Sequence, residues 1–328
     1  MRSRFSPEQY VEGILGGDRI VLSRAITLVE SRLPADRDLA ERVLTDLLPN
    51  TGHSVRVGIT GVPGVGKSTF IEAFGSHLTG LGKRLAVLTV DPSSPLSRGS
   101  ILGDKTRMER LSRDPLAYIR PSAAGTSPGG VADATREALL LCEAAGFEVI
   151  LVETVGVGQS EVLVKGMVDF FLLLMLAGAG DELQGVKRGI MEMADALLIT
   201  KADGDNQAPA RLARAEYESA LHLFPKPESR WLPPVRTCSA RSGEGIAETW
   251  ALIQDFVTLT AANGFFEKNR QQQRVAWLHQ SLRRKLEELF FQNPLIQSRL
   301  PELETAVRRG EALPVQVASQ LLGSFGPQ

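Results

Sequence analysis

One stretch of the chain reads Gly61-Val62-Pro63-Gly64-Val65-Gly66-Lys67-Ser68-Thr69. It matches the pattern GxxxxGK followed by Ser or Thr, and it lies between a β-branched run and a helical pattern. Glycines let successive backbone N–H groups curve around phosphates, and a helix N-terminus adds its positive end. We therefore expect a nucleotide here, with Lys67 neutralising its β- and γ-phosphates and the Ser68 hydroxyl binding Mg²⁺.

Short apolar runs alternate with longer helical patterns around this loop. The runs predicted as strands are Val55–Thr60, Leu85–Val90, Ala117–Ile119, Val149–Thr154, Phe170–Met175, Ala196–Thr200 and Val235–Cys238. Helical patterns fall near 67–80, 131–145, 187–194, 207–222 and 244–262. This alternation predicts an α/β fold, a P-loop NTPase with a central, mostly parallel sheet covered by helices on both faces. Ligands of such sheets bind at the carboxyl ends of the strands.

Helical patterns also flank the α/β region. We expect an N-terminal helical extension over 1–50, the nucleotide-binding domain over 51–263 and a C-terminal helical arm over 264–328. Ser6-Pro7-Glu8-Gln9 has the residues of a capping box, and Asp18 and Asp36 are further candidate N-caps. The arm pattern contains a long helix over 267–291 and two shorter ones near 295–309 and 314–322.

Composition narrows the classes of partner. The 328 residues carry 37 Lys and Arg against 38 Asp and Glu, so a net charge of -1 favours neither nucleic acid nor an anionic membrane. The most apolar stretch, Phe170–Ala179, is shorter than the roughly 20 residues that span a bilayer. Cys142 and Cys238 lie in apolar segments, and the N-terminus lacks the apolar run of a secretory signal. These features predict a cytoplasmic protein.

Two loops after predicted strands indicate guanine recognition. Thr200-Lys201-Ala202-Asp203 resembles the NKxD element of GTPases, with threonine in place of asparagine, which should weaken the bracing of the loop. The Asp203 carboxylate can accept from N1–H and N2–H₂ of guanine, whereas adenine N1 offers a lone pair. The Lys201 stem can lie over the base, and Ser239-Ala240-Arg241 resembles the loop that backs guanine with amides.

Acidic residues at two other strand ends are candidate metal ligands. Asp91 follows one strand, and Glu153 closes another within Glu153-Thr154-Val155-Gly156, which resembles DxxG with Glu for Asp. Either carboxylate can hold Mg²⁺ directly or through water, and the alternative role for each is a helix cap or a surface charge. The Gly156 amide is placed to sense the γ-phosphate.

A third candidate segment follows Asp91. Between the second and third strands, Asp104 could orient the attacking water, and Lys105 or Arg107 could meet the charge of the γ-phosphate. An ordinary charged helix start explains the same residues equally well. Gln159 lies three residues beyond Gly156, so we expect Asp104 or Glu153, not Gln159, to organise water and metal.

Together, these elements resemble one family. The segments GVPGVGKST, DPSS, GDKTRM, ETVGVGQSE, GAGDELQGVKRGIMEMAD and TKAD match the pattern of the MeaB/ArgK G proteins over nearly the whole chain. The resemblance implies a GTPase in the broad class of signal-recognition and nickel-insertion G proteins. It also implies a chaperone of an adenosylcobalamin-dependent acyl-CoA mutase that gates cofactor delivery and protects or reactivates the mutase. Asp181, Lys187 and Arg188 would then lie in a switch facing the mutase; their alternative role is a solvated helix start.

The resemblance leaves alternatives for the partner and the reaction. Methylmalonyl-CoA mutase is the favoured partner, with a related ethylmalonyl- or isobutyryl-CoA mutase as the alternative. None of the four histidines lies in a DxHxxG element, so we expect no tightly bound cobalamin in this chain alone. A metallochaperone GTPase would need Cys and His clusters, and a kinase of a transport protein would need ATP.

The C-terminal pattern predicts a homodimer. One apolar stripe follows a single helix face with steps of three and four, and its residues are Val275, Leu278, Leu282, Leu286 and Leu289. An appended helix needs a surface to cover such a stripe, and a second copy of the arm supplies a self-complementary one. The alternative is that the stripe packs on the chain's own N-terminal helices.

Overall fold

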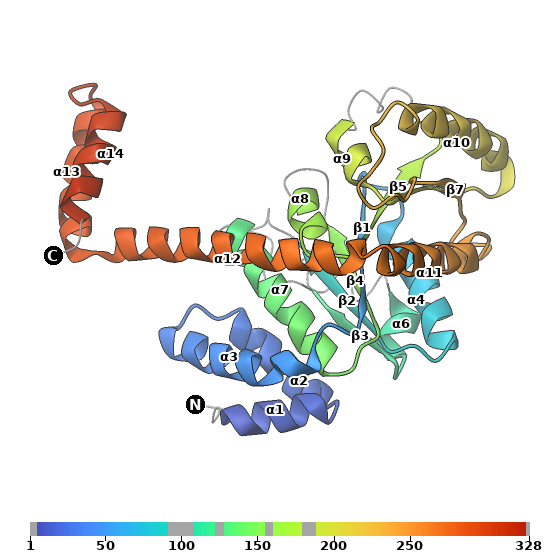
Figure 1. The fold of residues 1–328 in the computed structure, drawn as a ribbon, viewed down its shortest axis with the longest axis horizontal. Coiled ribbons are helices and arrows are strands. Elements are labelled where there is room, and N and C mark those ends of the chain that lie inside the picture. Colours follow the sequence, from blue (N-terminus) through green and yellow to red (C-terminus); the bar gives the residue numbers. More distant parts are fainter. Residues whose placement is uncertain (1–4, 91–107, 122–127, 155–159, 179–187, 326–328) are drawn as a thin grey trace. The chain divides into compact units, whose positions relative to one another are not determined.

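The computed structural model describes residues 5–90, 108–121, 128–154, 160–178 and 188–325, without the side chains of 128–130 and 188. The chain forms two compact units, Met1–Gln273 and Arg274–Gln328. The first holds the sheet and its helices, and the second holds most of the C-terminal helices (Figure 1).

One parallel sheet organises the first unit. Its strands are β1 (Val55–Gly61), β2 (Leu85–Val90), β3 (Ala117–Arg120), β4 (Val149–Thr154), β5 (Phe170–Leu176), β6 (Ala196–Thr200) and β7 (Val235–Thr237). They are arranged in the order β3-β2-β4-β1-β5-β6-β7, and each described pairing is parallel. The predicted α/β fold and its strands are confirmed. In the middle of the sheet, β1 lies between β4 and β5, so its carboxyl end points the phosphate loop into the centre of that edge.

Helices cover both faces of the sheet. The helices on one face are α4 (Lys67–Gly80), α6 (Glu109–Arg113) and α11 (Ile246–Ala262). Those on the other are α7 (Pro128–Ala144), α8 (Ser160–Lys165), α9 (Arg188–Met193) and α10 (Gln207–Leu221). Alternate residues of β5 divide between the two cores, with Leu172 on the first face and Leu173 on the second. Because helices cover both faces of the sheet, the side chains on both sides of each strand are buried, and the strands are therefore continuous apolar runs in the sequence.

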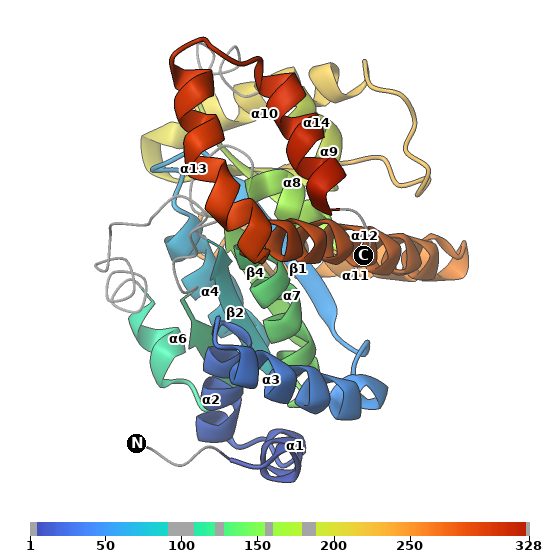
Figure 2. The same ribbon diagram turned by 90° about the vertical axis from the view of Figure 1, so that its left-hand side faces the viewer.

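Three N-terminal helices pack against α7: α1 (Pro7–Leu15), α2 (Arg19–Val29) and α3 (Pro34–Leu47), which a short turn at Leu48–Asn50 follows (Figure 2). Ser6 and Gln9 form the predicted capping box, and Asp18 accepts from two backbone amides as the N-cap of α2. The prediction of Asp36 as an N-cap is wrong. Helix α3 begins with Pro34 after Leu33, and Asp36 lies in its first turn, where it accepts from the Ser31 hydroxyl.

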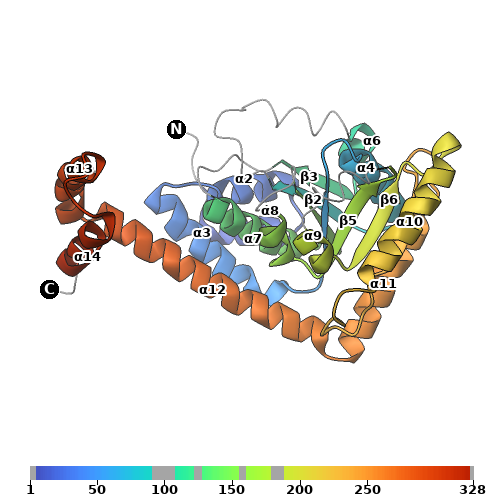
Figure 3. The ribbon, with the colours of Figure 1, turned by 90° about the horizontal axis from the view of Figure 1, so that it is seen from above.

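The C-terminal helices are α12 (Phe265–Gln292), α13 (Pro294–Arg308) and α14 (Pro314–Phe325). Helix α12 begins in the first unit and ends in the second. Within the second unit, α13 and α14 lie side by side around a small core of Ile296, Val317 and Leu321 (Figure 3). Among the residues that the structure describes, no helix is long and apolar enough to cross a membrane.

Both cysteines are buried in the cores of the first unit. Burial raises the pKa of the Cys142 thiol well above its usual range and that of Cys238 to about 12. Since the thiolate is the reactive form, burial and the raised pKa disfavour both side chains as nucleophiles. Their role is to fill the core.

Candidate nucleotide-binding site

The predicted phosphate loop forms a turn between β1 and α4. Gly61, Gly64 and Gly66 have φ values of 155°, 79° and 96°, which residues with a Cβ rarely adopt. A Cβ on Gly61 would lie 2.5 Å from the carbonyl oxygen of Leu174 on β5, so only glycine fits there. Helix α4 begins at Lys67 without a side-chain cap, which leaves its first amides available to phosphate oxygens.

Lys67 is folded back onto this turn. Its ammonium group donates to the carbonyl oxygens of Gly61 at 2.8 Å and Val62 at 3.4 Å. Burial lowers the pKa of Lys67, while the negative charges of Glu153 and Glu161 act in the opposite direction. The Lys67 ammonium group is therefore partly buried at the phosphate loop and interacts electrostatically with the carboxylates of Glu153 and Glu161. Ser68 and Thr69 follow it in the first turn of α4, half-buried and exposed respectively.

The two predicted base-recognition loops meet each other. The Ser239 hydroxyl donates to Asp203 Oδ2 at 2.7 Å, and the Ala202 amide donates to the carbonyl oxygen of Cys238 at 3.1 Å. Residues 239–241 form the turn after β7, so Ala240 and Arg241 lie beside this contact. The structure thus joins the carboxyl ends of β6 and β7 at the Asp203 side chain.

The same region is connected to the phosphate loop by two side chains. Lys201 Nζ donates to the carbonyl oxygen of Gly64 at 2.9 Å. Thr200, which stands where asparagine is usual, donates its hydroxyl to the carbonyl oxygens of Val65 at 2.8 Å and Met175 at 3.2 Å. Thr200 therefore braces this loop through its hydroxyl, at the position where the sequence predicted only that the loss of asparagine weakens the bracing. These contacts join the base side of the candidate site to its phosphate side.

Some of the candidate metal and switch residues lie in the part of the chain that the structure describes, and others lie outside it. Glu153 is buried at the end of β4, and its backbone pairs with Ile59 of β1 and Thr89 of β2. Outside the described residues lie the predicted side chains of Asp91, Asp104, Lys105, Arg107, Gly156, Gln159, Asp181 and Lys187. Arg188 is the first residue of α9. Glu161, to which we assigned no role, is buried in α8 and acts on Lys67 electrostatically.

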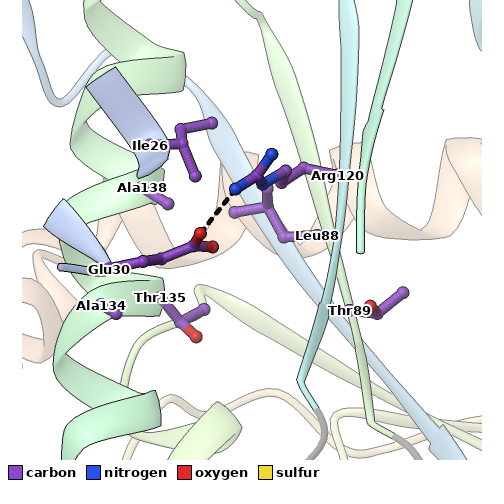
Figure 4. A pocket seen from close by; sticks show the side chains of 8 residues that line it. All are labelled: Ile26, Glu30, Leu88, Thr89, Arg120, Ala134, Thr135 and Ala138. Carbon is purple, nitrogen blue, oxygen red and sulfur yellow. Dashed lines mark hydrogen bonds and ion pairs between the residues drawn. The ribbon is translucent and has the colours of Figure 1, made fainter. Parts of the chain in front are cut away.

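A small cavity lies elsewhere, between the N-terminal helices and the sheet (Figure 4). Its volume of about 20 Å³ holds roughly one water molecule. Arg120 of β3 donates to the carboxylate of Glu30 across it at 2.5 Å, and Thr135 of α7 lines it. This cavity is too small for a nucleotide, and its ion pair fastens the helix α2 region to the edge strand of the sheet.

The geometry agrees with a match to one family model, described as methylmalonyl Co-A mutase-associated GTPase MeaB, over residues 22–295. The chain belongs to this family. As a MeaB family member it is a GTPase of the P-loop class, in agreement with the joined phosphate and base loops.

Several relatives of this MeaB-family chain are similar to it over most of their length. A probable GTPase of Mycobacterium tuberculosis is 52% identical, and the match covers 94% of this chain and 92% of the relative. GTPase ArgK of Escherichia coli is 50% identical over 84% of each chain. The mitochondrial methylmalonic aciduria type A homolog of Mus musculus is 48% identical over 98% of this chain and 80% of the relative.

A solved structure extends the likeness to the fold. The crystal structure of a protein named LAO/AO transport system kinase has a TM-score of 0.77 and 39% identity, and it covers 98% of this chain and 99% of its own. Its name denotes a kinase, whereas the relatives from Mycobacterium tuberculosis and Escherichia coli are named GTPases.

Proposed function

We propose that this protein binds GTP and GDP with Mg²⁺ and hydrolyses GTP to GDP and phosphate. The observation that carries the proposal is the Asp203 carboxylate, held by Ser239 beside a lysine that reaches the phosphate loop. Its free acceptor capacity suits the two donors of guanine, and adenine would leave the charge unpaired. Displacement of labelled GDP tests this: GTP should compete and ATP should not, and equal competition by ATP would contradict it.

The metal would be held by oxygen ligands around Ser68. The Ser68 hydroxyl and the Glu153 carboxylate are hard donors of the kind that Mg²⁺ prefers, and Asp91 would complete the set. When bound, Mg²⁺ neutralises charge on the β- and γ-phosphates. Chelation with EDTA should abolish GTP hydrolysis and weaken GTP binding, whereas unchanged turnover would rule out the metal's role.

For the chemical step we propose that Asp104 or Glu153 organises the attacking water and metal, with Lys105 or Arg107 meeting the γ-phosphate charge. Lys67 is the cation on the phosphate side. Single-turnover hydrolysis by Asp104→Ala, Glu153→Ala and Gln159→Ala separates the candidates. The assignment is wrong if Gln159→Ala loses partner-stimulated hydrolysis while the other two variants keep it.

The biological partner we propose is an adenosylcobalamin-dependent acyl-CoA mutase, with methylmalonyl-CoA mutase favoured over an ethylmalonyl- or isobutyryl-CoA mutase. The family description supports this, because it names association with methylmalonyl Co-A mutase. The protein would gate cofactor delivery and protect or reactivate the mutase, while the mutase holds the cobalamin. A pull-down from native lysate with a non-hydrolysable GTP analogue should capture a mutase, identified by mass spectrometry; consistent capture without any mutase would contradict the proposal.

Coupling to the mutase would run through the segment of Asp181, Lys187 and Arg188. It leads directly into α9, which packs on the carboxyl half of β5 and is therefore at the nucleotide edge of the sheet. Lys187→Ala and Arg188→Ala should keep GDP affinity near that of the parent and reduce the stimulation of hydrolysis by the mutase. Unchanged stimulation in both variants would remove these residues from the coupling.

We further propose that the second unit makes a homodimer. Val275, Leu278, Leu282, Leu286 and Leu289 are between 48% and 60% exposed, so the stripe on α12 is available to a partner. Near its end, an apolar groove of about 920 Å³ opens among α12, α13 and α14, lined by Phe290, Val317 and Leu321 among others. A two-fold partner presents the same apolar surface and can cover both.

Two other functions are distinguished by simple binding measurements. A kinase, suggested by the name of the solved relative, would require ATP, which the Asp203 carboxylate disfavours. A metallochaperone would require a cluster of soft ligands, and the described part of the chain contains no group of three or more His, Cys, Asp or Glu arranged to hold a metal. ATP-dependent phosphoryl transfer to a protein, or tight stoichiometric nickel or zinc binding, would favour these functions instead.

A further inference from the structure

The loop that carries the candidate guanine-binding residues contains an unusual backbone conformation. Lys201 has a φ of 57°, one of two positive values at non-glycine residues in the described chain. Residues with a Cβ adopt this left-handed region at a cost in free energy, so something in the surroundings has to hold it. The conformation occurs between Thr200, which is tied to the phosphate loop, and Asp203, which is tied to Ser239.

Asn206 makes the contacts that hold this turn. Its side-chain Nδ2 donates to the carbonyl oxygen of Lys201 at 2.7 Å, and its backbone amide donates to the carbonyl oxygen of Asp203 at 3.0 Å. One residue thus satisfies the carbonyl groups of both candidate base-binding residues. The side chain closes a ring from 201 to 206 that contains Asp203.

A second observation is that the Asn206 side chain does not cap a helix, although Asn206 ends the short 3-10 turn Gly204–Asn206 that leads into α10. Asn206 is the N-cap residue of α10, and asparagine is among the best N-caps because its side-chain oxygen accepts from helix amides. In this structure its side chain makes no such capping bond. The amide is directed to the carbonyl oxygen of Lys201 instead. The residue therefore stabilises the loop before the helix rather than the helix itself.

We propose that Asn206 is a positioning residue for guanine recognition. It acts through Lys201 and Asp203 and does not touch the nucleotide, so this inference rests on the proposed binding of guanine by those two residues. Without the Nδ2 donor, the left-handed turn loses its tether, and Asp203 spends less time in the orientation that meets N1–H and N2–H₂ of the base. The phosphate loop keeps its contact with Thr200, so we expect the phosphate side of the site to change less than the base side.

The test compares Asn206→Ala with the parent for GDP, for inosine diphosphate, which lacks the 2-amino group, and for GTP turnover. The affinity for GDP should fall about three- to tenfold, as expected for the loss of the one exposed hydrogen bond to the carbonyl oxygen of Lys201. The ratio of the affinity for GDP to that for inosine diphosphate should fall. KM for GTP should rise, and kcat should stay unchanged. A merely structural role would lower the melting temperature and weaken both diphosphates by the same factor, which would overturn the inference.

Asn206→Asp is the matched control for capping. Aspartate is as good an N-cap as asparagine and similar in size, but its carboxylate cannot donate to the carbonyl oxygen of Lys201. It should lose the preference for GDP as Asn206→Ala does, and parental binding by Asn206→Asp would overturn the inference. If the unmodified protein itself failed to prefer GDP over both inosine diphosphate and ADP, the proposed guanine site would fall as well. If the parent preferred GDP over inosine diphosphate and both variants kept that preference, the proposed guanine site would stand and only the role of Asn206 would be refuted.

Discussion

At the scale of single residues, Thr200 ties the base side of the candidate site to the phosphate side. Its one hydroxyl proton is directed to the carbonyl oxygens of Val65 in the phosphate loop and Met175 in β5. The side chain is buried, so water cannot replace it as a donor to those carbonyl groups. Removing the hydroxyl therefore loses the hydrogen bond. It also leaves a buried carbonyl oxygen without a donor, which costs further free energy.

We predict that Thr200→Val lowers the free energy of unfolding by about 1–3 kcal/mol and weakens GDP binding severalfold. Valine keeps the volume of threonine, so the effect reports the hydroxyl group. Urea unfolding and GDP titration measure the two quantities. The control is Thr260→Val in α11, where an equally buried hydroxyl donates to Phe256 within its own helix. If Thr260→Val weakened GDP binding as much as Thr200→Val, the brace would not be specific to the site.

The sequence was sufficient for some of these residues and insufficient for others. Lys67 and Asp203 stand in short contiguous motifs whose chemistry is local, and the structure brings their loops together as expected. Thr200 acts on Val65, 135 positions away in the chain, and no local pattern encodes such a contact. Asn206 was missed for a different reason, because it lies three positions beyond the motif and its contact with Lys201 depends on how the intervening turn folds.

At the scale of elements, a buried carboxylate fastens the end of α7 to the start of β1. Glu143 accepts from the Gly52 amide at 2.9 Å, from Arg56 Nε at 2.9 Å and Nη2 at 2.8 Å, and from the Ser54 hydroxyl. Burial alone raises the pKa of Glu143, but the hydrogen bonds and charge of Arg56, with the Ser54 and Gly52 donors, outweigh it and lower the pKa overall.

This lowered pKa predicts a contribution of Glu143 to acid sensitivity. A carboxyl group with a lower pKa in the folded state stabilises the protein above its unfolded pKa of about 4.3, and the contribution disappears as pH falls through the folded pKa. Glu143→Gln should unfold about 3 kcal/mol more easily at pH 7, because it leaves Arg56 unpaired. It should also lose less further stability between pH 5 and pH 3 than the parent does. Urea unfolding across that range checks this, and an equal loss in both proteins would contradict it.

Element prediction succeeded where the pattern was long enough to show a period. The seven predicted strands match β1–β7 to within one residue at each end, because their apolar runs are continuous and bounded by polar turns. Helices α6 and α8, of five and six residues, were not predicted, whereas α9, also of six residues, falls in the predicted helical stretch near 187–194. Helices this short present less than two turns of periodicity, so the sequence pattern detects them unevenly. Packing against the sheet, rather than local pattern, stabilises helices this short.

At the scale of the whole molecule, the beginning of α12 belongs to the nucleotide-binding unit. Arg270 forms a bidentate pair with Asp169 at 2.7 Å for each bond, and it also donates to the carbonyl oxygens of Gly52 and Ser54. Both charged side chains are buried. The alternation of strand and helix patterns in the sequence ends before residue 264. The ion pair nevertheless links Arg270 to Asp169, 101 positions earlier in the chain, and the first unit extends to Gln273.

The ion pair determines how the proposed dimer has to be tested. A chain ending near Gly264 would lack Arg270 and leave Asp169 buried without its partner, at a cost of about 3–5 kcal/mol. A chain ending at Gln273 keeps the pair and removes only the second unit. We predict by light scattering that the full chain is a dimer at micromolar concentration and that the shorter chain is a monomer with an unchanged melting temperature. A monomeric full chain would refute the dimer, and a dimeric shorter chain would place the interface elsewhere.

Recognition of guanine by Asp203 underlies both the proposed GTPase activity and the proposed role of Asn206. The most direct measurement is calorimetric titration of the parent and of Asp203→Asn with GDP, xanthosine diphosphate and ADP. The parent should bind GDP and neither of the others. In Asp203→Asn the side-chain oxygen can accept from N1–H and the new amide can donate to the C2 carbonyl of xanthine, so the preference should change from GDP to xanthosine diphosphate. A parent that binds ADP as tightly as GDP, or an Asp203→Asn variant that keeps the parental preference for GDP, would contradict the account.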